Sequence, residues 1–188
     1  MIRSVTAAFV LIAATAGTAA SDDPGLRRYE LPNRDTLELT LPAGWVDQLV
    51  EPEGGGPPTL EVAITGGGPR QVFVTPEWPD PTANDLREPS MLRDTVRDLA
   101  AKIKSQAVES FIEVRQLNGA NGIGFYFTAT DRDPAAGEFK FMNQGALQVG
   151  NLTLWFTILA NEGEDTVAVQ ALSMLQAAVH RRTGLDQL

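Results

Sequence analysis

The sequence predicts an α+β domain in which helices pack on the faces of an antiparallel sheet of about six to seven strands. Short segments in which apolar and polar residues alternate, separated by Gly- and Pro-rich turns, are typical of such strands. Two longer segments repeat apolar residues every three or four positions, as amphipathic helices do. The order along the chain is four strands, helix, four strands, helix. We therefore expect three layers: helix, sheet, helix.

The first four strands are short. Leu37, Leu39 and Leu41 alternate with polar residues, so one face of their strand should be buried and the other exposed to water. Trp45 follows a Pro-Ala-Gly turn, starts the second strand and is expected in the core. The predicted strands are Thr36–Leu41, Trp45–Val50, Thr59–Thr65 and Arg70–Thr75.

A helix is predicted over Ser90–Val108, because its apolar residues recur at spacings of 4, 3, 4 and 4, with Ser90 as its N-cap. The closing helix starts near Asp165 and extends to about His180, whose positive charge would suit the helix dipole. Four strands lie between them: Phe111–Leu117, Ile123–Thr130, Phe139–Val149 and Leu152–Ala160. The last strand is apolar on both faces, which indicates cover on both sides of the sheet.

The N-terminus has the three parts of an export signal. Arg3 is followed by an apolar run of about 12 residues and by small residues that end at Ala20. A buried N-terminal helix and an uncleaved membrane anchor are the alternatives. Cleavage would remove 1–20 and leave a flexible segment, 21–28, and a single domain, 29–188. No other apolar stretch reaches the length of a membrane span. We expect a periplasmic or secreted bacterial protein, without a stable membrane span after cleavage.

The composition excludes several kinds of function. The formal net charge is −9, which argues against nucleic-acid binding, since that depends on neutralising phosphates with Lys and Arg. There is no Cys, so disulfides, thiolate metal sites and thiol nucleophiles are excluded. There is one His, so no metal site can use two imidazoles. We predict no cofactor.

Several segments together resemble the PsbP-like group of proteins. They are the turn Leu41–Trp45 after an early strand, the segment Gly124–Phe127, a strand centred on Gly145, and Ala171–Leu175 in the closing helix. The group includes extrinsic photosystem II proteins, Ran-binding Mog-type proteins and bacterial exported DcrB-like proteins. The resemblance covers about residues 29–180. It implies an antiparallel sheet between helices and a non-catalytic binding or accessory role, and it assigns no functional residue.

The densest group of carboxylates lies on one predicted turn and comprises Asp131, Asp133 and Glu138. Calcium prefers six to eight oxygen ligands, which an acidic turn can supply in part. However, Ala135 and Ala136 stand where a calcium loop needs an Asp or Asn followed by a Gly. The three carboxylates are therefore weak metal candidates, and a solvated turn is the simpler interpretation.

The segment Pro76–Pro89 contains four prolines and predicts a long surface loop. Trp78 in that loop would lose little entropy on binding, because the neighbouring prolines stiffen the backbone. Trp78 and its neighbour Glu77 are therefore candidate partner-binding residues. The alternative is that the loop folds back and Trp78 caps the sheet edge or a helix.

These observations predict a non-enzymatic exported accessory or interaction domain, whose partner is another exported or envelope protein. One alternative is a carrier that holds a small apolar ligand between a helix and the strand Ile123–Thr130. Another is a hydrolase that uses carboxylates such as Asp131 and Glu138. His180 could serve a Ser, but no Gly-x-Ser-x-Gly elbow is present, so a helix-end cation is the expected role.

Overall fold

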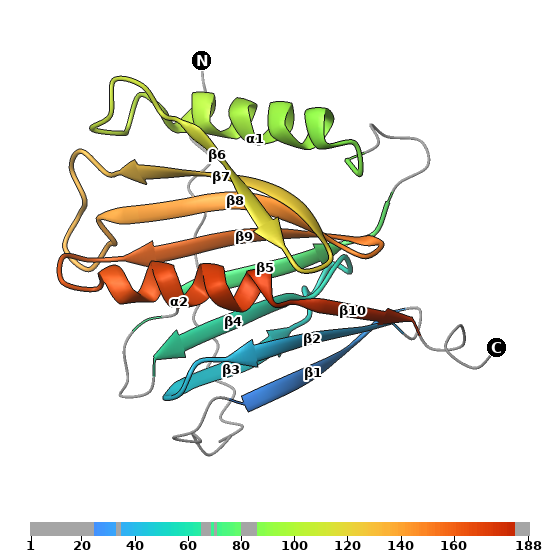
Figure 1. Ribbon diagram of the computed structural model, residues 1–188. Helices are drawn as coiled ribbons and strands as arrows, with labels where there is room; N and C mark the ends of the chain where they lie inside the picture. The colour runs from blue at the N-terminus through green and yellow to red at the C-terminus, as the bar shows by residue number, and fades with distance from the viewer. Residues whose placement is uncertain (1–24, 33–34, 65–68, 70, 80–85, 183–188) are drawn as a thin grey trace.

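The computed structural model describes residues 25–32, 35–64, 69, 71–79 and 86–182. Within these residues, ten strands and two helices form an α+β fold with two antiparallel sheets (Figure 1). The larger sheet has seven strands in the order β3-β4-β5-β9-β8-β7-β6. The predicted α+β class and the antiparallel sheet are confirmed. The proposed export signal, 1–20, lies outside the described residues.

The seven-stranded sheet is built almost entirely from predicted strands. Two strands match their predicted bounds at both ends, and the other five differ by a few residues. The seven are β3 (Trp45–Val50), β4 (Thr59–Ile64), β5 (Val72–Glu77), β6 (Val114–Gly119), β7 (Gly122–Thr130), β8 (Phe141–Val149) and β9 (Leu152–Ala160). Trp45 is buried in the core, as predicted.

A second, three-stranded sheet contains two strands that the sequence did not predict. Its order is β1-β2-β10, with β1 (Gly25–Leu31), β2 (Asp35–Leu41) and β10 (Val179–Arg182). All of β1 pairs with β2, so residues 25–28 are part of a strand, although segment 21–28 was expected to be flexible. The pairing with β2 supplies the backbone hydrogen bonds that this polar segment cannot make alone.

The closing helix, α2 (Asp165–Gln176), ends before the predicted residue. The prediction that it reaches His180 is wrong, because Val179–Arg182 forms β10 and His180 lies opposite Leu37 of β2. Val179 continues the helical spacing of apolar residues, so the periodicity gave no sign of the change. Distant pairing with β2 decided the conformation here, as tertiary context often does.

The first helix, α1 (Pro89–Ile103), also differs from its prediction. Its N-cap is Glu88, and Ser90 lies inside the first turn, so the predicted Ser90 cap is wrong. Pro89 explains the shift, because its fixed φ suits the first helical position and it lacks the N–H that would be left unpaired there. The predicted last turns instead form a loop, 104–113.

Side chains alternate across the strands and assign the two helices to opposite faces of the seven-stranded sheet. On one face, Phe156 and Ile158 share a core with α2 and the three-stranded sheet. On the other face, Phe125 and Phe127 share a smaller core with α1, which lies over β6, β7 and β8 (Figure 1). The three-stranded sheet adds a layer that the predicted order of helix, sheet and helix does not contain.

Candidate interaction surface

The structure separates the two predicted partner-binding residues. Pro76 and Glu77 still belong to β5, so the predicted loop begins only at Trp78. Trp78 is half-buried, packs against the larger core and donates a hydrogen bond from Nε1 to Asp35 Oδ2 at 2.8 Å. Trp78 is thus folded back against the molecule, whereas Glu77 is exposed on the α1 side of the sheet. Binding of a partner by either residue stays a prediction.

Asp35 also joins Trp78 to His180, which is a buried residue of β10. His180 Nε2 lies 3.4 Å from Asp35 Oδ2, and the His180 side chain is only 2% exposed. Its Nδ1 accepts a hydrogen bond from the Asn151 backbone N–H at 3.2 Å. His180 is therefore a buried link between three segments, and its predicted role as a helix-end cation is wrong.

A His–Asp pair could support a nucleophile, as in a catalytic triad. Within the described part of the chain, however, no Ser or Thr hydroxyl is hydrogen-bonded to His180, and both of its ring nitrogens face other groups. The arrangement of Trp78, Asp35 and His180 fits a structural link between β2, β10 and the end of β5.

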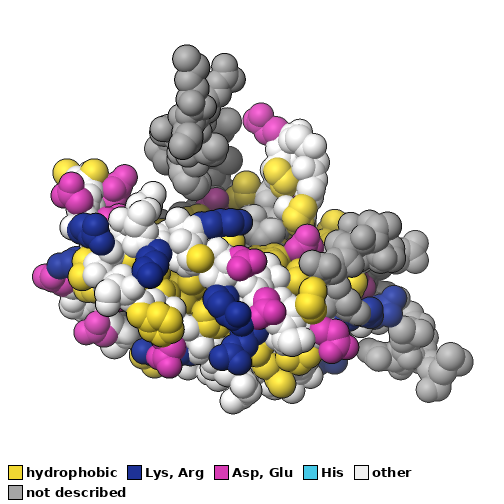
Figure 2. Space-filling model, turned by 90° about the horizontal axis from the view of Figure 1, so that it is seen from above, with side chains coloured by type: hydrophobic (Ala, Val, Ile, Leu, Met, Phe, Trp, Pro, Cys, Tyr) yellow, Lys and Arg dark blue, Asp and Glu magenta, His cyan; other side chains and the backbone are white. Residues whose placement is uncertain are grey.

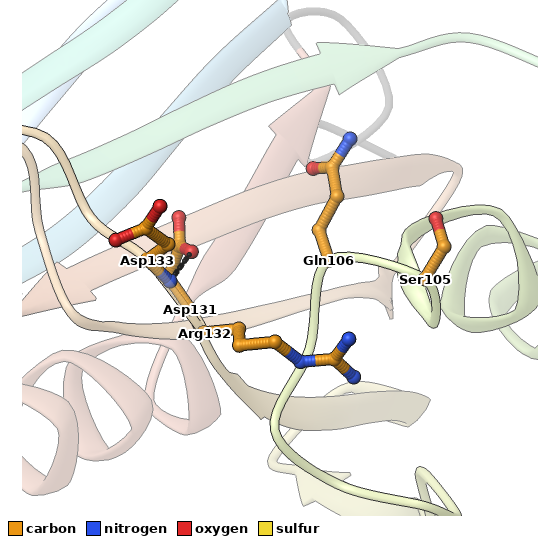
Figure 3. A pocket seen from close by; sticks show the side chains of 5 residues that line it. All are labelled: Ser105, Gln106, Asp131, Arg132 and Asp133. Carbon is orange, nitrogen blue, oxygen red and sulfur yellow. Dashed lines mark hydrogen bonds between the residues drawn. The ribbon is translucent and has the colours of Figure 1, made fainter.

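The predicted acidic turn borders a polar hollow of about 330 Å³ (Figure 3), which is lined by Ser105, Gln106, Asp131, Arg132 and Asp133. The Asp131 carboxylate accepts a hydrogen bond from the Asp133 N–H at 2.9 Å, drawn dashed in Figure 3. Glu138 does not line the hollow and accepts a hydrogen bond from the Ala135 N–H at 3.0 Å. Among the described residues, no three His, Cys, Asp or Glu side chains are placed to hold a metal ion.

The loop 104–113 beside this hollow presents two exposed apolar side chains, Val108 at 58% and Phe111 at 76% exposure. The loop is held in place by Glu109, whose carboxylate accepts hydrogen bonds from the backbone N–H and the hydroxyl of Thr130. Burial opposes ionisation of Glu109, but these hydrogen bonds hold its pKa below the usual value. The loop is thus an ordered feature with an exposed apolar tip.

A larger exposed surface lies on the α1 side of the seven-stranded sheet. The core beneath α1 contains no residue of β3, β4 or β5, so half of this sheet face lacks packed cover from that helix. We call this half the open face; by strand pairing it comprises Val46, Gln48, Val50, Thr59, Glu61, Ala63, Phe73, Thr75, Glu77, Gln144, Trp155, Thr157 and Leu159. Only Ala63 among them is buried.

Four hydrogen-bonded pairs of side chains connect neighbouring strands across the open face. They are Gln48 with Glu61, Thr59 with Thr75, Gln144 with Thr157, and Trp155 with Glu77. These bonds hold the side chains in fixed conformations before any partner arrives. A surface ordered in this way loses less side-chain entropy when it binds.

Two half-buried aromatic side chains supply apolar area on the open face. Phe73 pairs with Thr157 of β9, and Trp155 pairs with Thr75 of β5, so both rings project from the same side of the sheet. Aromatic residues of this kind carry much of the binding energy at protein interfaces. The sequence pattern indicated a β9 buried on both sides, and it gave no sign that α1 would cover only half of that side.

The face of the molecule drawn in Figure 2, seen from above, carries Lys and Arg side chains intermingled with Asp and Glu. The described residues on this face therefore form no continuous basic patch of the kind that binds a polyanion. No described helix is both long and apolar enough to span a bilayer. No protein-family model matches the chain, and no curated protein is significantly similar to it. Function must therefore be inferred from the surface itself.

Proposed function

We propose that this chain is an exported, non-enzymatic interaction domain that binds another exported or envelope protein through its open face. The observation that carries the proposal is a sheet face with half-buried Phe73 and Trp155, ordered by side-chain hydrogen bonds between strands. Export rests on the signal-like sequence of residues 1–20. The open face replaces Trp78 as the centre of the proposed interface, and it keeps Glu77.

The packing does not favour the two alternative functions. A carrier would need space between α1 and β7, but Phe127 of β7 is fully buried against Leu92 and Val96 of α1. A carboxylate hydrolase would need two carboxyl groups facing one cleft. Asp131 and Asp133 line one hollow, but the Asp131 carboxylate is bonded to the Asp133 N–H. Glu138, the other carboxylate considered for this chemistry, lies outside the hollow and accepts a hydrogen bond from the Ala135 N–H.

We also propose that the fold is a distant PsbP-like arrangement. The support is an antiparallel sheet with one helix on each face. The added layer of β1, β2 and β10 is the feature in which this chain would differ from a simple helix, sheet and helix. A comparison of an experimentally determined structure with PsbP-like proteins tests this relation, and a different strand order in those proteins would contradict it.

The proposed function is tested by capture of a partner from a periplasmic extract. The bait is the chain from Ser21 onward, immobilised as wild type, as Phe73→Asp or as Val169→Asp. We expect Phe73→Asp to reduce capture of any specific partner at least tenfold, because a charge enters the centre of the open face. Val169 is 65% exposed on α2, which lies on the opposite side of the sheet, so Val169→Asp should leave capture unchanged.

Two further baits distinguish the candidate surfaces. Trp78→Phe should capture the partner normally, because Trp78 is folded against the core. Phe111→Ser tests the exposed tip of loop 104–113. If capture is lost with Phe111→Ser and retained with Phe73→Asp, the partner binds at that loop and the open face is not the interface.

A further inference from the structure

We propose that the open face recognises an arginine of its partner at the pair formed by Glu77 and Trp155. This inference rests on the proposed function and names the chemistry of the partner. Glu77 is the exposed last residue of β5, and its Oε2 accepts a hydrogen bond from Trp155 Nε1–H. The carboxylate thus holds the indole in place, and the Trp155 side chain, which packs in part against the core beneath α1, stays partly exposed on the open face.

A guanidinium group matches this pair better than other side chains do. Its positive charge can form an ion pair with the Glu77 carboxylate while its planar surface stacks on the Trp155 ring. A lysine ammonium offers the charge without the planar surface, so it should bind less well. An acidic side chain would meet the Glu77 charge and be repelled.

The rest of the open face favours the same partner. Glu77 supplies an exposed carboxylate at the end of β5, whereas Glu61 already accepts a hydrogen bond from Gln48 Nε2. Phe73 lies two positions from Thr75 on β5, and Thr75 is the cross-strand neighbour of Trp155. The apolar Phe73 side chain is therefore close to the pair formed by Glu77 and Trp155. The matching segment therefore carries an arginine next to apolar residues. A second copy of this chain is disfavoured, because two open faces would bring like charges together.

The test uses three blocked hexapeptides in which valine alternates with arginine, lysine or glutamate. Binding to the 15N-labelled chain from Ser21 onward is followed by NMR at the backbone amides of Thr75 and Thr157 and at the Trp155 indole. We expect the arginine peptide to bind at least fivefold more tightly than the lysine peptide, and the glutamate peptide not to bind. Added salt should weaken binding of the arginine peptide.

Glu77→Gln should reduce the affinity for the arginine peptide at least fivefold. Glu30→Gln is the matched control, since Glu30 is exposed on β1 in the other sheet, and it should bind as wild type. Equal affinity of Glu77→Gln and wild type, or binding of the glutamate peptide, would overturn the arginine site. If Phe73→Asp still abolishes partner capture in that case, the proposed function stands without this site. If Phe73→Asp leaves capture intact, the proposed function fails whatever the peptides show.

Discussion

The two faces of the seven-stranded sheet are built from the same strands, but they differ in how deeply their side chains are buried. In β9, Leu154, Phe156 and Ile158 point toward α2 and the three-stranded sheet, and all are buried. Trp155 and Leu159 alternate with them on the other face and are only half-buried. One face is therefore almost completely buried, while the other keeps partly exposed aromatic area, which we propose as the interaction surface.

The difference arises from the number of elements available as cover. The first face receives α2 and the strands β1 and β2, which pack together in one large core. Of the described helices and strands, α1 alone packs on the second face, and its core lies over one half of it. The second face therefore keeps partly exposed apolar area, and contiguous exposed apolar area often marks an interaction site.

The largest loss of stability should come from a substitution in the larger core, on the covered face of the sheet. Phe156 is 2% exposed within the larger core, so Phe156→Ala should lower the free energy of unfolding by about 3–5 kcal/mol. Phe73→Ala removes a half-exposed ring of the open face and should cost about 1 kcal/mol. Urea unfolding of both variants measures the contrast. Equal losses would mean that the open face is packed as tightly as the covered one.

The next largest effect tests the contacts of Asp35, which connect β2 to Trp78 and to His180 of β10. Asp35→Ala would leave Trp78 Nε1 without its acceptor and would remove the carboxylate that lies 3.4 Å from His180 Nε2, an atom with no hydrogen-bond partner among the described residues. We expect a loss of about 2 kcal/mol, chiefly because the indole N–H is then unpaired. Trp78→Phe removes one of the donors and should cost less. A double variant measures the coupling, and strictly additive losses would contradict a shared link.

A smaller effect depends on pH and involves Glu38 of β2. Hydrogen bonds from Arg28 and Arg181, which flank it on β1 and β10, hold the pKa of Glu38 below its usual value. Its contribution to stability is therefore complete above the unfolded-state pKa of about 4.3 and is lost as the pH falls through the lower folded pKa.

Glu38→Gln should accordingly cost about 1 kcal/mol at pH 7, because the two arginines are largely exposed to solvent. At pH 3 the variant and the wild type should differ less. Urea unfolding at both pH values checks the sign. A gap between the two proteins that widens at low pH would show that the charge of Glu38 does not stabilise the three-stranded sheet.

The smallest effect is expected on the outer surface of α2. Val169→Asp should change the free energy of unfolding by less than about 0.5 kcal/mol, since this exposed side chain is not part of either core. Thermal unfolding measures this value. A larger loss would disqualify Val169→Asp as the control for the partner-capture experiment.

Local patterns predicted most of the fold, because alternation and helical spacing are properties of single segments. Trp45–Val50 and Leu152–Ala160 were predicted at both ends. The missed strands, β1 and β10, depend on pairing with β2, which no local pattern reports. Gln148 is a polar residue of β8 that is nevertheless buried, because β8 lies between β7 and β9 and Gln148 donates to the Leu86 carbonyl and Thr153.

The candidate site was harder to predict than the fold. Glu77 was identified for its position beside Trp78, but its hydrogen-bond partner is Trp155, 78 positions along the chain. Trp155 itself looked like a core residue, since apolar residues on both sides of a strand usually indicate cover on both sides. Only the placement of α1 over half of the sheet shows that Trp155 lies at the margin of the cover.

The central claim is that the open face contacts a partner in the cell, and photo-crosslinking tests it most directly. A benzoylphenylalanine introduced at Phe73, and separately at Val169, is activated in intact cells that export the chain. The account predicts a discrete crosslinked product from position 73 and none from position 169. A product from position 169 with none from position 73 would contradict it.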